Sequence, residues 1–135
     1  MKILGTDHIG IAVKSIDQSI EFYRQGLGLE LGGIEEIPDR HLRVGFINTG
    51  NTRLEFIEST SEESAIAKYI AKKGEGIHHI CLRVDDIEAA LARLKAEGFK
   101  LIDSEPQSGA EGTKVAFVHP KATNGVLIEL NQTSK

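Results

Sequence analysis

Two histidines and two glutamates recur at matching places in two similar stretches of the chain. His8 in TDHIGIAVKSI aligns with His79 in IHHICLRVDDI at an offset of 79 − 8 = 71 residues. Glu55 aligns with Glu129 at an offset of 129 − 55 = 74 residues. Imidazole nitrogens and carboxylate oxygens suit a divalent transition metal such as Co, Ni, Mn, Fe or Zn. Four such ligands would leave positions open for water or substrate, as a catalytic metal requires.

Each of these residues taken alone has a simpler explanation. A single strand histidine is more often a hydrogen-bonded structural residue than a ligand, and a single glutamate more often lies on a solvated face. Their common register with the repeat favours a joint metal site. His78 must point away from the face of His79, and His41 and His119 lie in polar loop or turn sequences. Cys81 alternates in phase with His79 and is interpreted as a small buried residue rather than a nucleophile.

The repeat extends well beyond these four residues. Val13 aligns with Val84 and Phe46 with Phe117 at the offset of 71, and a longer final turn, HPKATNG, changes the offset to 74. Tandem copies of one unit usually bury their faces against each other. We therefore expect an α+β fold of two tandem βαβββ modules, whose eight strands form a curved, incompletely closed barrel-like sheet around a metal cleft. The predicted organisation is one domain, residues 1–135, with modules 1–60 and 76–135 and a linking helix at 61–75.

Hydrophobic periodicity and capping residues predict the elements of each module. Strands are expected at residues 4–13, 30–37, 43–48, 53–58, 77–84, about 100–103, 114–119 and 125–131. Helices are expected to begin after the N-caps Ser15, Ser61 and Asp86. Their apolar residues at helical spacing are Ile16, Ile20, Tyr23 and Leu27 in the first, Ile66 and Ile70 in the second, and Ile87, Leu91 and Leu94 in the third.

Composition excludes several classes of function. The 135 residues are 40% apolar and 27% charged, with a net charge of −4. Acidic and basic residues are interspersed, so neither a nucleic-acid partner nor a membrane surface is expected. The N-terminal apolar run is too short for a signal peptide, and a single cysteine excludes an internal disulfide. These features favour a cytoplasmic protein, and homodimerisation is the default expectation.

Several motifs resemble a known family. The stretches DHIGIAV, NTRLEF, SAIAKYIAKKGEGIHHICLRVDDI and HPK…GVLIEL are similar to the vicinal oxygen chelate superfamily and, within it, to methylmalonyl-CoA epimerases. The resemblance covers nearly the whole chain. It implies metal ligands at His8, Glu55, His79 and Glu129, with His79 rather than His78 as the ligand of the doublet. It also implies an acyl-CoA substrate and a divalent metal, with Co first and Ni, Mn, Zn or Fe as alternatives.

The reaction implied by the resemblance is interconversion of the 2R and 2S forms of methylmalonyl-CoA through a metal-stabilised enolate. Inversion requires a proton acceptor on one face of the α-carbon and a donor on the other. We expect Glu129 to be one acid/base. Some members take the second from an acid on the third strand of the first module, but that strand, RVGFIN, has none here. Glu55 is the remaining candidate, followed by Glu35 and Glu36.

Three alternatives remain on the same fold. Glyoxalase I shares the ligand types and a proton-transfer reaction, but glyoxalases tend to carry a DPDG-like turn where this chain has HPKATNG. An extradiol-type oxygenase would use two His and one Glu, so Glu55 as a fourth ligand argues against it. A non-catalytic small-molecule-binding protein of the bleomycin-resistance kind is also open, because fold does not imply function.

Overall fold

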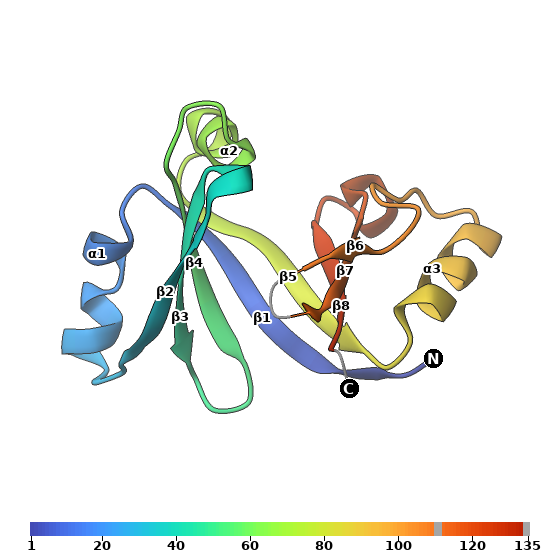
Figure 1. The fold of residues 1–135 in the computed structure, drawn as a ribbon, viewed down its shortest axis with the longest axis horizontal. Coiled ribbons are helices and arrows are strands. Elements are labelled where there is room, and N and C mark those ends of the chain that lie inside the picture. The colour runs from blue at the N-terminus through green and yellow to red at the C-terminus, as the bar shows by residue number, and fades with distance from the viewer. Residues whose placement is uncertain (110–111, 134–135) are drawn as a thin grey trace. The chain divides into compact units, whose positions relative to one another are not determined.

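The computed structural model describes residues 1–109 and 112–133 and divides the chain into two compact units (Figure 1). Residues 8–78 form one, here called the N-terminal unit. Residues 1–7 and 79–135 form the other, here called the C-terminal unit. These boundaries differ from the module boundaries expected at residues 60 and 75, and the division into two modules and a linker stays a prediction.

Four strands of the N-terminal unit pair in the order β2-β3-β4-β1. They are β1 (Ile3–Val13), β2 (Leu31–Ile37), β3 (Leu42–Asn48) and β4 (Arg53–Ser59). The hairpins β2–β3 and β3–β4 are antiparallel, whereas β1 pairs with β4 in parallel. The parallel register places Gly10 opposite Glu55 and His8 opposite Arg53.

The C-terminal unit repeats this order with β5-β8-β7-β6. Its strands are β5 (Gly76–Val84), β6 (Gln107–Ser108), β7 (Lys114–Val118) and β8 (Ile128–Gln132). Here β5 pairs with β8 in parallel and places Cys81 opposite Glu129. Since Cys81 and Glu129 align with Gly10 and Glu55, the strand pairing has the same register in both units.

One helix follows the first strand of each unit, and a further helix follows β4. The two helices that follow the first strands are attached to their sheets in the same way. The helical segments are α1 (Ile16–Ser19), α2 (Ala65–Lys73) and α3 (Ile87–Ala96), with the short turns η1 (Phe22–Gly26), η2 (Pro38–Arg40) and η4 (Pro120–Thr123). Ser15 and Asp86 cap α1 and α3, as expected. The last strand adds a second bond: Glu58 accepts the first N–H of α1 and Gln132 that of α3, both at 2.8 Å. No helix among the described residues is long and apolar enough to span a membrane.

The first helix departs from the expected regular stripe. After α1 the chain forms the π-helical turn η1, in which the N–H of Leu27 bonds to the carbonyl of Phe22, five residues earlier. Ile16 and Ile20 are buried as expected, but Leu27 is 58% exposed. A π-turn inserts one residue into the helical register and so rotates the following side chains away from the core.

The second helix begins later than expected. Its N-cap is Ser64, whose hydroxyl accepts the N–H of Ala67 at 2.9 Å, so the prediction of Ser61 was wrong. Ser61 instead lies in a tight turn, where its N–H bonds to the hydroxyl of Ser59 and its own hydroxyl accepts the N–H of Glu63. Serine side chains favour both caps and turns, so spacing alone did not distinguish the two.

The strand expected at about residues 100–103 is reduced to one bridge from Leu101 to β7. The N–H groups of Ile102 and Asp103 both bond to the carbonyl of Phe117, and the carboxylate of Asp103 accepts the N–H of Phe117 at 2.8 Å. A side chain therefore replaces a ladder bond and ends the pairing. The edge strand of this unit is the two-residue β6.

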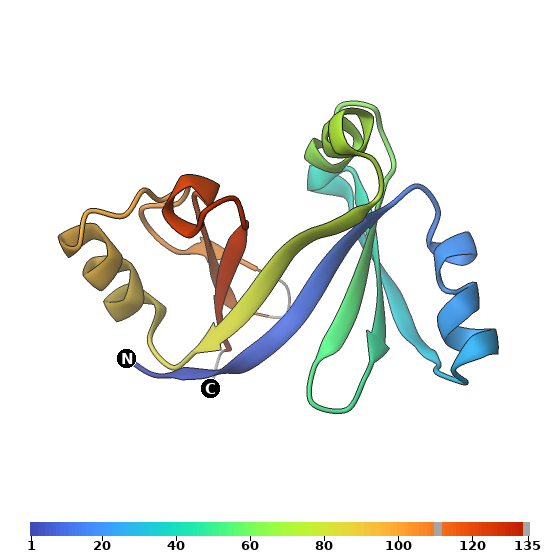
Figure 2. The same ribbon diagram turned by 180° about the vertical axis from the view of Figure 1, so that it is seen from behind.

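Each unit has its own apolar core. In the N-terminal unit, α1 and η1 cover one face of the sheet and α2 covers part of the other, as Figure 2 shows. The core under α1 contains Val13, Ile16, Ile20, Ile47 and Phe56, and that under α2 contains Ala12, Val44, Ile57 and Ile66. In the C-terminal unit α3 packs on Val84, Ile87, Ala90, Leu91, Ala116, Val118 and Leu130. The sheet face opposite α3 carries the polar residues described below.

Substitution of the two serines tests the start of α2. We expect Ser64→Ala to lower the free energy of unfolding by about 1 kcal/mol, because a buried N-cap bond is lost. Ser61→Ala, the matched control, should change it by less than about 0.5 kcal/mol. Urea denaturation followed by circular dichroism measures both. A larger loss for Ser61→Ala would place the cap at the earlier serine.

Candidate metal and catalytic site

In the N-terminal unit, strand register brings His8 and Glu55 together on one face of the sheet. The Nε2 atom of His8 lies 3.5 Å from Oε2 of Glu55. His8 is buried and the Glu55 side chain is 16% exposed. Phe46 is directly opposite Glu55 on β3 and shares its face. The face therefore presents an imidazole and a carboxylate beside an aromatic ring.

In the C-terminal unit, His79 and Glu129 form the equivalent pair. The Nε2 atom of His79 lies 3.1 Å from Oε1 of Glu129, and both residues are buried. Phe117 is opposite Glu129 on β7 and contacts the His79 ring edge to face at 5.7 Å between centroids. The two units thus contain the same His–Glu–Phe arrangement at repeat-related positions.

The geometry of each pair fits two ligands of one cation. Ligand atoms that bind a transition metal at about 2.1 Å and at right angles to each other lie about 3 Å apart. Both Nε2-to-carboxylate distances are close to that value. Buried carboxylates need a compensating positive charge or strong hydrogen bonds, and a metal ion supplies the former. The donors are harder than a thiolate set, in keeping with Co, Mn, Ni, Fe or Zn.

The other histidines have structural surroundings. His78 stacks edge to face on Tyr69 of α2 at 4.8 Å, on the side of the strand away from His79. His41 is exposed and ends η2 in a left-handed conformation. His119 accepts the N–H of Lys121 through Nδ1 at 3.0 Å, and partial desolvation and nearby lysine charges lower its pKa. These positions agree with the structural roles expected for them.

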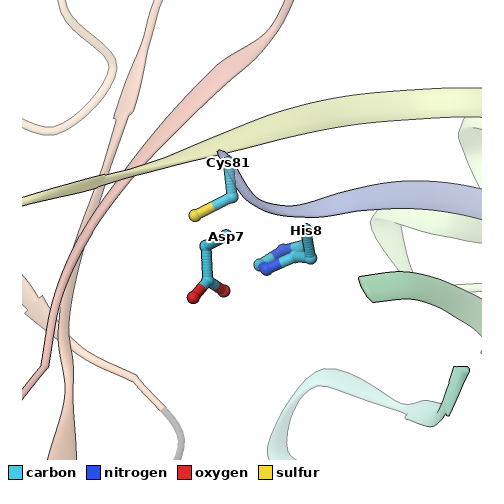
Figure 3. A group of neighbouring side chains, drawn as sticks. All are labelled: Asp7, His8 and Cys81. Atoms are coloured by element: carbon cyan, nitrogen blue, oxygen red, sulfur yellow. The ribbon is translucent and has the colours of Figure 1, made fainter. Parts of the chain in front are cut away.

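A buried acid that the sequence analysis did not consider is Asp7 of the C-terminal unit. Its Oδ1 atom accepts two hydrogen bonds from the guanidinium of Arg83, at 2.6 and 3.2 Å. A carboxylate oxygen of Asp7 lies within 4.8 Å of the thiol of Cys81 (Figure 3). Cys81 is fully buried, which agrees with its interpretation as a small interior residue. The ion pair therefore holds the Asp7 carboxylate and the Arg83 guanidinium in place within the C-terminal unit.

Glu35 and Glu36, which rank after Glu55 as candidates for the second acid/base, lie on opposite faces of β2. Glu36 is opposite Arg43 on β3, and Arg43 is opposite Glu58 on β4, so all three lie on the α1 face. Oε2 of Glu36 accepts a hydrogen bond from Arg43 at 2.9 Å. This bond, with the charge of Glu58, raises the pKa of Arg43. Glu35 is opposite Val44 and so shares the face of Glu55. Of these two acids, only Glu35 is on the side of the His8–Glu55 pair.

Asn131 is a further polar residue on the face of Glu129 that the sequence analysis missed. It lies two residues after Glu129 on β8 and opposite Arg83 on β5. It is 8% exposed, and its Oδ1 atom is buried without a hydrogen-bond partner among the described residues. A buried amide oxygen in this state is available to a ligand N–H. The signal in the sequence was a polar residue at the alternating position after Glu129 in IELNQ.

Comparison with known proteins gives a consistent family. Residues 7–117 match the family described as the Glyoxalase/Bleomycin resistance protein/Dioxygenase superfamily. An ethylmalonyl-CoA/methylmalonyl-CoA epimerase of Cereibacter sphaeroides is 43% identical over 93% of this chain and 96% of its own length.

Solved structures of epimerases share the fold over almost the whole chain. A single-substitution variant of the Streptomyces coelicolor methylmalonyl-CoA epimerase, in complex with 2-nitronate-propionyl-CoA, is 34% identical, with a TM-score of 0.89 over 99% of this chain and 100% of that chain. A methylmalonyl-CoA epimerase in complex with methylmalonyl-CoA and NH4+ is also 34% identical, with a TM-score of 0.88 over 98% of this chain and 96% of that chain. The predicted fold class is therefore confirmed. The chain belongs to the methylmalonyl-CoA epimerase family of the glyoxalase/bleomycin resistance protein/dioxygenase superfamily.

Proposed function

We propose that this protein interconverts (2R)- and (2S)-methylmalonyl-CoA by removing the proton at C2 and returning it to the other face. The observation that carries the proposal is the buried His–Glu pair on an equivalent face of each unit, in a chain of this family. A substrate hydrogen between a thioester and a carboxylate is acidic enough to be removed by a positioned carboxylate when the developing charge is stabilised.

The four residues His8, Glu55, His79 and Glu129 would together hold one divalent cation. The support for joining the two pairs is the sequence repeat, which gives each unit half of the same ligand set, and the contact of a histidine Nε2 with a glutamate oxygen in each half, at 3.5 and 3.1 Å. When bound, the cation would supply a Lewis acid for the oxygens of the substrate. Cobalt is the first choice for the metal, with Ni, Mn, Zn and Fe as alternatives.

Glu129 is our choice for one acid/base. It is buried on β8, beside His79 and opposite Phe117, so bulk water has little access to its carboxylate. A carboxylate with little hydration does not have to lose bound water before it takes a proton from the substrate. A carboxylate has two oxygens, so one can face the cation while the other reaches the substrate proton.

The second acid/base is either Glu55 or Glu35. Glu55 has the same relation to His8 and Phe46 that Glu129 has to the other pair. Glu35 lies on the same face, one strand beyond Phe46, and its exposure allows it to move. Glu36 is excluded by its position on the α1 face and its bond to Arg43. We place Glu55 first, because its carboxylate is already beside His8.

Deuterium exchange tests the reaction. The Co-loaded protein in D2O is expected to replace the C2 hydrogen of methylmalonyl-CoA with deuterium, as followed by proton NMR. Glu129→Gln should slow the exchange by about a hundred- to ten-thousandfold, because a positioned base is lost. Metal content is measured in parallel to separate loss of the base from loss of the cation. Turnover of the methylglyoxal–glutathione hemithioacetal without exchange would assign the protein to glyoxalase I instead.

The adjacent histidines provide a matched test of the ligand set. His79→Ala should lower affinity for Co by at least about a hundredfold, because one donor of the set is removed. His78→Ala, which removes only a contact with Tyr69, should retain the metal and most of the activity. Titration with Co followed by its visible absorption measures both. Equal metal loss in the two variants would contradict the assignment of His79.

Three glutamate-to-glutamine variants assign the second acid/base. We expect Glu55→Gln to reduce both metal content and exchange, since one residue serves both purposes. Glu35→Gln should reduce exchange alone if it carries the proton, and Glu36→Gln is the control on the opposite face. Exchange from each substrate epimer is measured separately, because each base serves one face of the α-carbon. Unchanged metal loading and turnover in Glu55→Gln would remove Glu55 from the site.

A further inference from the structure

The two units differ in charge beside their His–Glu–Phe arrangements. In the N-terminal unit the residue two positions before Glu55 is Arg53, whereas the residue two positions before Glu129 is Leu127. These positions are related by the same offset of 74 as the glutamates. One half of an otherwise repeated arrangement therefore has a permanent positive charge, and the other half has an apolar side chain there.

Strand register places Arg53 on the face of the His8–Glu55 pair. It is opposite His8 on the parallel neighbour β1, and it alternates in phase with Glu55 along β4. Its guanidinium carbon lies 4.5 Å from the centre of the Phe46 ring, and Phe46 is opposite Glu55. Stacking on an aromatic face restricts the conformations of the long Arg53 side chain.

This part of the face lies at the edge of the core under α2, against which Phe46 packs. The core under α2 includes Ala12, Val44 and Ile57, which lie further along the strands than His8, Phe46 and Arg53. Both views show the β3–β4 turn, which immediately precedes Arg53, at the end of the strands away from α2 (Figures 1 and 2). Arg53 is half-buried, so its guanidinium can meet both solvent and a ligand.

We propose that Arg53 binds the free carboxylate of the substrate and thereby fixes the orientation of the substrate on this face of the N-terminal unit. This inference rests on the proposed epimerase reaction. The α-carbon of methylmalonyl-CoA has an anionic carboxylate on one side and a neutral thioester on the other. A guanidinium beside the reacting carbon favours the orientation that brings the carboxylate to it.

The carboxylate suits this position better than the phosphates of CoA. Arg53 is beside His8 and two residues from Glu55, so its ligand must lie close to the reacting carbon. The phosphates are separated from that carbon by the whole pantetheine arm.

Binding of two thioesters to Arg53→Gln tests the proposal. Isothermal titration calorimetry measures methylmalonyl-CoA and propionyl-CoA, which differ by the carboxylate and share the phosphates. We expect Arg53→Gln to weaken methylmalonyl-CoA binding by about ten- to a hundredfold, as loss of a charge-assisted hydrogen bond does, and to leave propionyl-CoA binding unchanged. Arg53→Lys should restore part of the affinity, since the charge remains and the planar fork is lost.

Arg24→Gln is the matched control, because it removes the same charge from an exposed position in the same unit. It should bind both thioesters like the parent protein. Equal weakening of both ligands by Arg53→Gln would overturn the carboxylate assignment in favour of phosphate, and unchanged affinity for both would leave Arg53 a structural partner of Phe46. Circular dichroism and metal content confirm that each variant is folded and loaded. Absence of turnover in the parent protein would count against the proposed reaction, whereas the binding measurements alone decide whether Arg53 binds the carboxylate.

Discussion

The parallel pairing of the first strand with the last strand of each unit is the constraint on which the site depends. It aligns Gly10 with Glu55 and Cys81 with Glu129, and so brings a carboxylate beside the histidine of the neighbouring strand. A slip of one residue would turn the carboxylate to the opposite face of the sheet. The apolar residues under α1 and α3 resist such a slip, because it would expose them. The cores therefore hold the register that the polar faces require.

The bond between each last strand and each helix adds to the same constraint. Glu58 and Gln132 are equivalent residues, and both accept the first N–H of the helix in their unit. The position of the helix and the position of the acidic residue on the strand are thus set by the same strand. The bond is present in both units, although its acceptor is a carboxylate in one and an amide in the other. The two units therefore share the geometry of this hydrogen bond and not a charge.

Sequence periodicity predicted all of the strands except β6, the caps Ser15 and Asp86, and the equivalent positions of the histidines and glutamates in the two units, because these follow from short-range patterns or from the repeat. The prediction failed where the same stretch of sequence is compatible with more than one local backbone structure. Ser61 and Ser64 are both acceptable caps, and only the turn formed with Ser59 distinguishes them. The exposure of Leu27 follows from a π-turn that no spacing rule indicates.

The missed residues of the site have a different origin. Arg53 and Asn131 matter through their cross-strand neighbours, and Asp7 through an ion pair 76 residues away in sequence. Their surroundings depend on register and sheet order, which the repeat indicates only for residues that occur in both copies. Features that break the repeat were therefore the least predictable part of the site.

The residues of strand β1 are divided between the two units. Residues 8–13 of β1 pair with β4, whereas Lys2 exchanges backbone and side-chain hydrogen bonds with Asp85, 83 residues later. During synthesis the N-terminal unit, residues 8–78, is complete while much of the C-terminal unit is still being made. The first seven residues therefore leave the ribosome long before their partners in the same unit, such as Arg83 and Asp85, have been made. Translation order therefore gives the two halves of a symmetric repeat different folding histories.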